Sequence, residues 1–527
     1  MMTRIILLNI YVILSVGILF AQTDNVSLSK KSNYHSWGTN WDSEVVMTNS
    51  LCTLTVVPKI GGRTMQYNLG AHAPIYVASG EVGETPTTYT IMGGFFTNVS
   101  PQSSWNWPPP PLLTMGAYTP TIIRNTADTC SVLLQGPVET TSSYPNVDGL
   151  QFKRTVTMFA ASTRINIAMT LVNKGTTTPV PHGIWDITEC TGGTQGIAYD
   201  TMIWVYFPLN PKSKLGDGRG YVCLNGFTDT TQWVKNAGGA GIMGIRYKGK
   251  AESLVGADDI AGWICYVDRR DGYTFVKRFT YVTGATYPDS GSSISVYTEN
   301  NASFLEVEVK GPISTLAPGD SITMVEDWYA ARSPGPIASV NNAGVVTRRL
   351  AAQPSGDSVD VQGSWGVFYP GYIKLVFVDA SGSKLSMVDS SAVTPLDSFV
   401  LNKELDVPPN SSALYLADYA IGGTFIGNLD SVALSAAGIV GNGPALRLQK
   451  SDTRITLRPD GSLAIAAEIN EPYSIEVSRL DGKRLAFFSG MHPQHFFYGR
   501  NGLSAGICLV TTRVAKCMTV QKIFVGK

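Results

Sequence analysis

Residues 154–159 read Arg154-Thr-Val-Thr-Met-Phe159, and residues 164–172 read Arg164-Ile-Asn-Ile-Ala-Met-Thr-Leu-Val172. In both runs apolar residues recur at every second position, which is the period of a β-strand with one buried face. Similar short runs recur along the chain between clusters of Gly, Pro, Asn, Asp and Ser, whereas helical periodicity is nearly absent. These patterns predict an all-β protein.

Composition limits the domain count and the function classes. The chain has 527 residues, which is too long for one ordinary domain at roughly 150 residues each. Lys plus Arg and Asp plus Glu are both 40, and only 15% of residues are charged, which argues against an electrostatic nucleic-acid binder. A hydrophobic content of 44% with 53 Gly and 29 Pro describes a packed, turn-rich protein and excludes a disordered one.

The spacing of linker-like segments predicts three modules. Residues 26–332 show continuous strand and turn patterns without a linker, so we expect one large β-sandwich there. Residues 333–345 are rich in turn formers and are the predicted linker. Short strand runs over 346–436 predict an immunoglobulin-like sandwich. After a second Gly-rich patch, residues 453–527 form the predicted last β module.

The N-terminus predicts an exported protein. Residues 1–21 carry Arg4, an apolar stretch from Ile5 to Phe20, and Ala21 before polar residues, which is typical of a secretory signal peptide. The alternative is an uncleaved membrane anchor, but the stretch is shorter than the ~20 residues a span needs. We therefore expect cleavage near Ala21 and a mature protein without a transmembrane segment.

The cysteines do not form a disulfide framework. The 7 cysteines are an odd number, contain no CxxC pair and are sparse for a disulfide scaffold. Cys508 and Cys517 lie on successive strand-like runs separated by a turn, so they are either cross-strand neighbours that bridge or two unpaired packing cysteines.

The last module carries motifs of an export address. It contains Leu480-Asp-Gly-Lys-Arg, Leu503-Ser-Ala-Gly-Ile-Cys-Leu-Val and a terminal β run that ends in Lys527. In these motifs it resembles the C-terminal sorting domains of the bacterial type IX secretion system, and it departs at Cys508, where that family usually has Tyr. The resemblance implies that export machinery is a partner and that the protein is secreted or lies on the outer surface of a Gram-negative bacterium.

Two segments of the first module suggest a ligand site. Arg63 follows Gly61 and Gly62 in a turn between two strands, where its fork of donors is a candidate for lining a pocket. Trp105 and Trp107 precede four prolines, Pro108 to Pro111. A stiff Pro run holds neighbouring aromatic side chains in place at low entropic cost, which suits stacking on a sugar ring. The alternative is a rigid loop whose indoles pack on the edge of the sandwich.

Several ordered segments carry a family resemblance. They are the Gly61-Gly-Arg turn, Trp105-Asn-Trp-Pro, His182-Gly-Ile-Trp-Asp-Ile-Thr, Lys277-Arg-Phe-Thr-Tyr, and Leu305-Glu-Val-Glu-Val-Lys-Gly-Pro with Glu326-Asp-Trp. Together they resemble the galactose-mutarotase-like superfamily over most of residues 45–332. The resemblance implies a β-supersandwich, two large antiparallel sheets whose concave face binds sugar.

The same resemblance implies roles for single residues. His182 is the candidate acid and Glu306 or Glu308 the candidate base of an epimerase-type reaction, with Arg63 and Lys277 as substrate contacts. The "N-H-x-H-G-G" segment of characterised mutarotases has no counterpart here. Glu306 and Glu308 are expected to share one strand face, where they act either as a catalytic base or as solvated surface residues. His182 fits a structural histidine equally well.

Three function classes stay open at this point. A carbohydrate-active enzyme predicts that His182 faces Glu306 or Glu308 across one pocket. A carbohydrate-binding protein predicts an aromatic groove around Trp105 and Trp107 without that pair, and a structural or adhesive protein predicts a concave face plugged by side chains. Serine hydrolase and zinc protease motifs are absent, and we expect neither metal nor cofactor.

Overall fold

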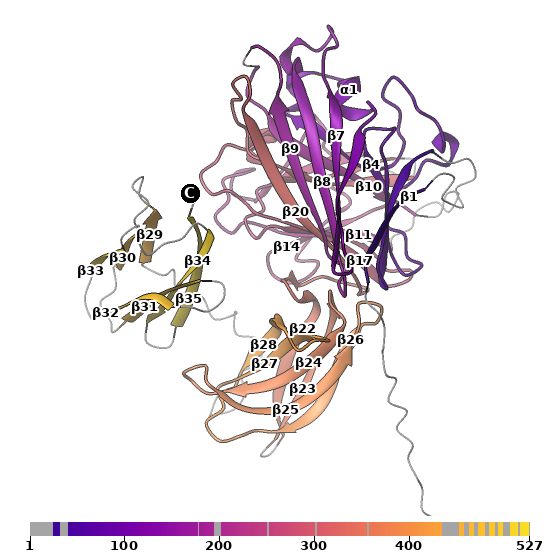
Figure 1. Ribbon diagram of the computed structural model, residues 1–527. Coiled ribbons are helices and arrows are strands. Elements are labelled where there is room, and N and C mark those ends of the chain that lie inside the picture. The colour runs from indigo at the N-terminus through magenta and orange to yellow at the C-terminus, as the bar shows by residue number, and fades with distance from the viewer. Residues whose placement is uncertain are drawn as a thin grey trace, which may run out of the picture. The chain divides into compact units, whose positions relative to one another are not determined.

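The computed structural model describes residues 25–31, 41–177, 179–193, 202–249, 252–300, 303–355 and 358–434, and then the seven strands between Thr453 and Val525. Outside the described residues lie the signal-peptide segment and, within the sorting motifs, residues 480–483 and 503–505. The described part of the chain is all-β, as the sequence predicts (Figure 1). Its helices are η1 (Ser79–Glu81), η2 (Gln102–Ser104), α1 (Pro111–Thr114), η3 (Pro145–Val147) and η4 (Asp289–Gly291).

Two compact units divide the chain. The first comprises residues 1–340, 366–370 and 394–398, and the second comprises 341–365, 371–393 and 399–527. The chain passes from the first to the second directly after β21 (Ser339–Val340). No helix in the described ranges is long and apolar enough to cross a membrane.

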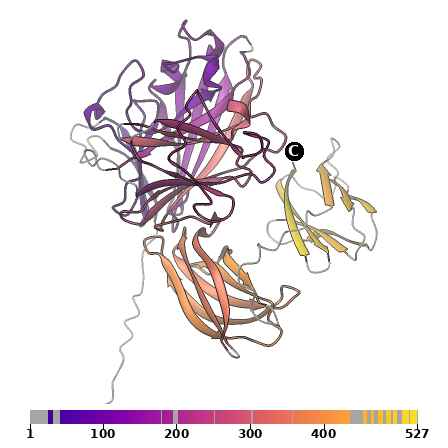
Figure 2. The same cartoon turned by 180° about the vertical axis from the view of Figure 1, so that it is seen from behind.

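The first unit contains two antiparallel sheets of ten strands each. The strands of sheet 1 are, in spatial order, β1 (Ser27–Lys31), β2 (Glu44–Thr48), β3 (Cys52–Val57), β4 (Arg63–Leu69), β5 (Gly94–Ser100), β10 (Gly183–Thr191), β19 (Phe304–Lys310), β18 (Ile294–Thr298), β15 (Ser253–Ala257) and β12 (Tyr221–Cys223). Those of sheet 2 are β13 (Trp233–Lys235), β14 (Ile242–Arg246), β11 (Ile203–Pro208), β16 (Trp263–Asp268), β17 (Tyr273–Phe279), β20 (Ser321–Arg332), β9 (Ile165–Asn173), β8 (Leu150–Phe159), β7 (Thr129–Val138) and β6 (Thr119–Asn125). Figures 1 and 2 show the two sheets from opposite sides.

Alternation along the strands forms the core between the sheets. In β8 the side chains of Phe152, Arg154, Val156 and Met158 are buried, and the residues that alternate with them are more exposed. At the centre the ring of Phe95 on β5 lies 4.9 Å, centroid to centroid, from Trp328 on β20. Such edge-to-face contacts add to the burial of apolar area that joins the two sheets.

The second unit begins with a small β-sandwich. One of its sheets contains β22 (Gly344–Ser355), β23 (Ser358–Val367) and β26 (Phe399–Asp406). The other contains β25 (Lys384–Val393), β24 (Gly371–Val378), β27 (Ala413–Ala420) and β28 (Phe425–Ala433). This is two antiparallel sheets face to face, the layer arrangement of an immunoglobulin-like sandwich.

The last strands also form two sheets. One has β29 (Thr453–Leu457), β30 (Leu463–Ala467) and β33 (Gln494–Tyr498), and the other has β32 (Arg484–Gly490), β31 (Tyr473–Arg479), β34 (Gly506–Val514) and β35 (Cys517–Val525). The register of β34 with β35 corrects the disulfide hypothesis. Cys508 lies opposite Ile523, whereas Cys517 lies opposite Val514, so the two cysteines are separated by roughly 20 Å along the hairpin. A disulfide requires Cα atoms within about 7 Å.

Candidate functional site

The first unit contains a cavity of about 420 Å³ on the side of sheet 1 that faces away from sheet 2. Its floor is made by side chains of β5, β10, β19, β18 and β15, and its rim by the loops before β5, after β5 and after β12. The lining residues are Tyr89, Ile91, Phe96, Asn98, Gln102, Trp105, Trp107, Trp185, Ile187, Asn225, Phe227, Glu252, Leu254, Tyr297, Glu299, Phe304, Glu306 and Glu308.

Strand register places the two glutamates of β19 in this cavity. Glu306 and Glu308 are two residues apart, so their side chains leave the same face of the strand. In the ladder Glu308 lies opposite Ile187 of β10 and Ser295 of β18, and Glu306 lies opposite Tyr297 of β18. The predicted sharing of one face is confirmed.

Glu308 is a buried side chain, which corrects its interpretation as solvated surface. It is 1% exposed, and its Oε2 accepts hydrogen bonds from Trp185 Nε1 at 2.8 Å and from the Ser295 hydroxyl. Lys310 Nζ lies 3.8 Å from the same oxygen. Burial raises the pKa of Glu308, and the charge of Lys310 opposes that rise. The other oxygen, Oε1, has no hydrogen-bond partner.

Glu306 differs from Glu308 in its electrostatic surroundings. Burial raises the pKa of Glu306 well above its usual value, and the negative charges of Glu308 and then Glu189 raise it further. Two neighbouring carboxylates of one strand repel each other, so the less compensated one retains its proton. The cavity therefore presents two neighbouring carboxyl groups with different surroundings, Glu306 with a raised pKa and Glu308 anchored by donors.

Aromatic side chains form the walls. Trp105 is largely buried and donates from Nε1 to the carbonyl of Val99 at 2.9 Å, while its ring lies 6.5 Å from Trp185. Trp107 is 63% exposed, and its ring meets the edge of Tyr89 at 4.8 Å. An indole with one face open to solvent at a cavity mouth is available for stacking. Both tryptophans line the cavity, as the sequence-based binding hypothesis expects.

Arg63 does not line the cavity but lies behind it. Its guanidinium is fully buried, donates from Nη1 to the Gly93 carbonyl at 2.7 Å and stacks over Phe96 at 3.8 Å. Burial lowers the pKa of Arg63, and the carboxylate of Glu189 opposes this. Burial also raises the pKa of Glu189 to about 7, with Arg63 opposing. The expected substrate contact is thus an internal support of the cavity wall.

The turn before Arg63 explains this burial. Gly61 and Gly62 both have positive φ values, +72° and +59°. A Cβ on Gly61 would lie 2.1 Å from the carbonyl oxygen of Thr114, so only glycine allows α1 to approach this closely. The turn directs Arg63 inward, under Phe96.

His182 is also outside the cavity, contrary to the predicted acid. It is 1% exposed, its Nε2 lies 2.9 Å from the carbonyl oxygen of Asn146, and its Nδ1 lies 3.4 Å from that of Ser100. Burial lowers the pKa of His182, which favours a neutral ring that donates to Asn146. The histidine connects loops, as its structural interpretation predicts.

Lys277 lies between the two sheets rather than at a ligand site. It is fully buried on β17 of sheet 2, and Nζ contacts Asp186 Oδ2 of β10 at 2.7 Å and the Val307 carbonyl of β19 at 2.8 Å. Glu326 is next to this pair, and burial and then the charge of Asp186 raise its pKa well above the usual value. The predicted substrate contact is therefore a buried inter-sheet ion pair.

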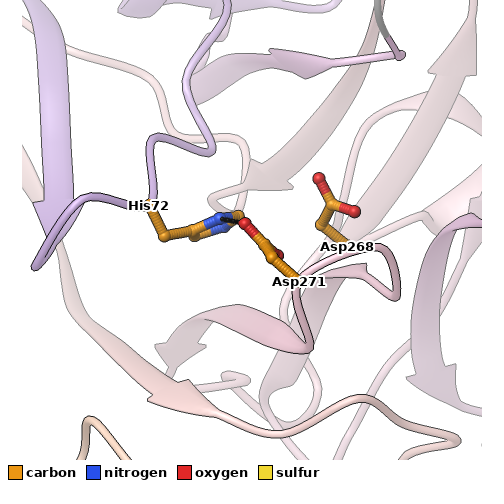
Figure 3. Close-up of side chains that lie close together, drawn as sticks. All are labelled: His72, Asp268 and Asp271. Carbon is orange, nitrogen blue, oxygen red and sulfur yellow. Dashed lines mark hydrogen bonds and ion pairs between the residues drawn. The ribbon is translucent and has the colours of Figure 1, made fainter.

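A second polar cluster lies away from the cavity. His72, Asp268 and Asp271 bring ligand-type atoms within 4.8 Å of one another (Figure 3). His72 Nδ1 already contacts Asp271 Oδ2 at 2.6 Å, and Arg270 Nε donates to both oxygens of Asp268, at 2.9 and 3.1 Å. A cation would have to compete with the guanidinium, so this cluster is better explained as an ion-pair network.

Sequence reasoning missed several lining residues. Trp185 lies two residues before Ile187, so both side chains leave the same strand face and both line the cavity. Tyr297 follows the same rule relative to Ser295 on β18. Glu252 and Glu299 lie next to the ends of β15 and β18, and no local pattern predicts that these ends meet.

Comparisons with known proteins give low-identity structural similarity. No protein-family model matches the chain, and no curated protein sequence matches it. Solved structures similar to it include a galactose mutarotase-like protein from Lactobacillus casei, with 10% identity, TM-score 0.36, and coverage of 55% of this chain and 99% of that one. Another is a galactose mutarotase-like protein from Clostridium acetobutylicum, with 10% identity, TM-score 0.37, and coverage of 58% of this chain and 99% of that one.

Proposed function

We propose that the first unit binds a carbohydrate in the cavity on sheet 1. The observation that carries this proposal is the combination of a half-open indole, Trp107, at the mouth and an unpartnered buried oxygen, Glu308 Oε1, at the floor. Sugar rings have apolar faces that stack on aromatics and hydroxyls that donate to carboxylates. A volume of about 420 Å³ is in the range of small-molecule sites.

The cavity separates the three function classes. A plugged concave face, expected for a purely structural protein, does not fit a cavity of this size. The His182–glutamate pair expected for an epimerase is not formed, because His182 is bonded to loop carbonyls. An aromatic groove around Trp105 and Trp107 without that pair favours recognition of the sugar.

Acid–base chemistry on the bound sugar is a second candidate, favoured by the raised pKa of Glu306 beside the anchored Glu308. Two carboxyl groups with different surroundings are the usual sign of an acid and a base. Both leave the same strand face, however, whereas anomeric inversion requires groups on opposite sides of the ring. Binding without turnover is therefore the main proposal.

The test is a screen of monosaccharides and oligosaccharides against the full chain by thermal shift, followed by calorimetry and by NMR of anomeric exchange. At ~100 times its dissociation constant, a ligand should stabilise the folded protein by about 2.7 kcal/mol. Trp107→Ala should weaken binding by about tenfold or more, because an exposed ring is lost without damage to the core. Ile123→Ala, an equally exposed apolar residue outside the cavity, is the matched control.

Each outcome decides between the candidates. Binding that Trp107→Ala weakens, without accelerated exchange, supports recognition. Anomeric exchange that the protein accelerates, and that is lost in Glu306→Gln, supports the acid–base enzyme. No binding by any sugar, or equal binding by the Trp107 and Ile123 variants, would contradict both.

We also propose that the protein is exported, on the basis of the apolar segment at residues 5–20 and the sorting-type motifs near the C-terminus. Mass spectrometry of the protein from culture medium and cell fractions is the test. A mature chain that begins at Gln22 and lies outside the cell is the expected result, whereas retention of Met1 in the cytoplasm would contradict it.

A further inference from the structure

The charged residues that line the cavity are all of one sign. Among the residues that line it, all of them described, four are glutamates and none is Lys, Arg or His: Glu252, Glu299, Glu306 and Glu308. Neutral sugars need both donors and acceptors around their hydroxyls. The lining offers such groups in the amides of Asn98, Gln102 and Asn225, but its charged residues are all acidic and attract positive charge, an effect that a partly enclosed site strengthens.

The rim glutamates share one hydroxyl group. The hydroxyl of Tyr297 lies 2.6 Å from Oε1 of Glu252 and 3.1 Å from Oε2 of Glu299. A phenol has a single proton, so it donates to only one of these carboxyls at a time. Burial and the contact with Glu252 raise the pKa of Tyr297, which keeps that proton in place. Glu299 Oε1 also accepts from the backbone N–H of Asn300 at 3.0 Å, so two carboxyl groups meet at one phenol with no cationic partner among the lining residues.

Aromatic rings surround the same place. Tyr297 lies 6.1 Å from Phe227 and 6.4 Å from Phe304, and all three line the cavity. Ring faces attract cations, and more strongly where water is partly excluded. At the floor, Glu308 Oε1 is buried without a partner, which is a second acceptor for a ligand donor.

We propose that the ligand is an amino sugar with a free amine, whose ammonium group lies between Glu252 and Glu299 while its ring stacks on Trp107. The inference rests on the proposed carbohydrate function and adds the class of sugar. An ammonium group has three donors, so it satisfies both rim carboxyls at once, which the Tyr297 hydroxyl cannot do. An N-acetylated sugar has the same ring but no charge, so it lacks this interaction.

The experiment compares matched sugars on the full chain by calorimetry at low salt: glucosamine with glucose and N-acetylglucosamine, and galactosamine with galactose. The amine should bind about tenfold tighter than its neutral counterpart, the equivalent of about 1.4 kcal/mol. The preference should shrink at high salt, because exposed charge pairs are screened. Glu252→Gln and Glu299→Gln should each lower the ratio of amine to neutral affinity, whereas the control Glu84→Gln, an exposed glutamate away from the lining, should leave the ratio unchanged.

The outcomes separate this inference from the proposed function. If neutral sugars bind as tightly as amines, or if the rim variants keep the full preference, the amino-sugar inference is wrong and carbohydrate binding stands. If no sugar of either kind binds, both fail. A preference that falls in both rim variants and survives in Glu84→Gln supports the inference.

Discussion

Replacing Lys277 by Met tests whether this residue supports the fold or contacts a ligand. The side chain is fully buried, and its ammonium group contacts a carboxylate oxygen of Asp186 and the carbonyl of Val307. Met has a similar volume, so the change removes charge without opening a large cavity. Asp186 would keep the hydrogen bond from Val309 N at 2.6 Å but would lose its counter-charge.

The expected cost follows from this geometry. Removing one partner of a buried pair typically destabilises a protein by about 3–5 kcal/mol, because the other charge stays buried and uncompensated. Glu326 nearby adds negative potential whenever it ionises. Guanidinium unfolding of the full chain, followed by tryptophan fluorescence, should show the loss in the transition of the first unit. The double variant Asp186→Asn with Lys277→Met should cost less than Lys277→Met alone.

A different result would contradict this reasoning. If Lys277→Met unfolds within about 1 kcal/mol of the unmodified protein and the sugar affinity disappears, then Lys277 contacts the ligand, as the family resemblance implies. A double variant less stable than Lys277→Met would also contradict the ion-pair argument, because removing the uncompensated charge of Asp186 should relieve part of the cost.

Three further predictions concern single residues. His182→Ala should cost about 1–3 kcal/mol of stability, because a loop carbonyl loses its donor, and calorimetry should show unchanged sugar affinity. Burial raises the pKa of Asp418 to about 7, so its contribution to the stability of the second unit is fully present below about pH 4 and is lost as the pH rises to 7. The loss is at most about 4 kcal/mol. In Asp418→Asn the melting temperature should therefore depend less on pH between about 4 and 7. Gly61→Ala should destabilise the protein by about 2 kcal/mol or more, because its φ is positive and the added Cβ would contact Thr114. Gly226→Ala has a similar φ of +77° but open space around it, so thermal melting should show a smaller loss that comes from the backbone strain alone.

The all-β class could be predicted from the sequence because the period-two pattern is a local property of each strand. The same local rule predicted that Glu306 and Glu308 share one face, and the register confirms it. The rule does not say whether that face is solvated or covered. Here the rim loops with Trp105 and Trp107 cover it, and those contacts join segments roughly two hundred residues apart.

The misassigned basic residues have a common cause. Lys277 and Arg63 are charged residues in strands, a pattern as typical of a pocket as of an internal ion pair. Whether such a residue binds a ligand or forms an internal ion pair depends on an acidic partner far away in the chain. Asp186 is 91 residues from Lys277, and Glu189 is on a different strand from Arg63. Only the three-dimensional pairing shows that both charges are compensated inside the protein.

The buried pair and the cavity depend on each other through β10. Asp186 points toward sheet 2 and Lys277, so its neighbours Trp185 and Ile187 point to the opposite face, where they line the cavity. A slip of β10 by one residue would bury the indole and leave Asp186 in the cavity without its lysine. Asp186 also accepts from Val309 on β19, the strand of Glu306 and Glu308, so one carboxylate ties both floor strands to the second sheet. The inter-sheet ion pair thus penalises the alternative register, and it positions the carboxyl groups of the cavity although neither of its residues lines the cavity.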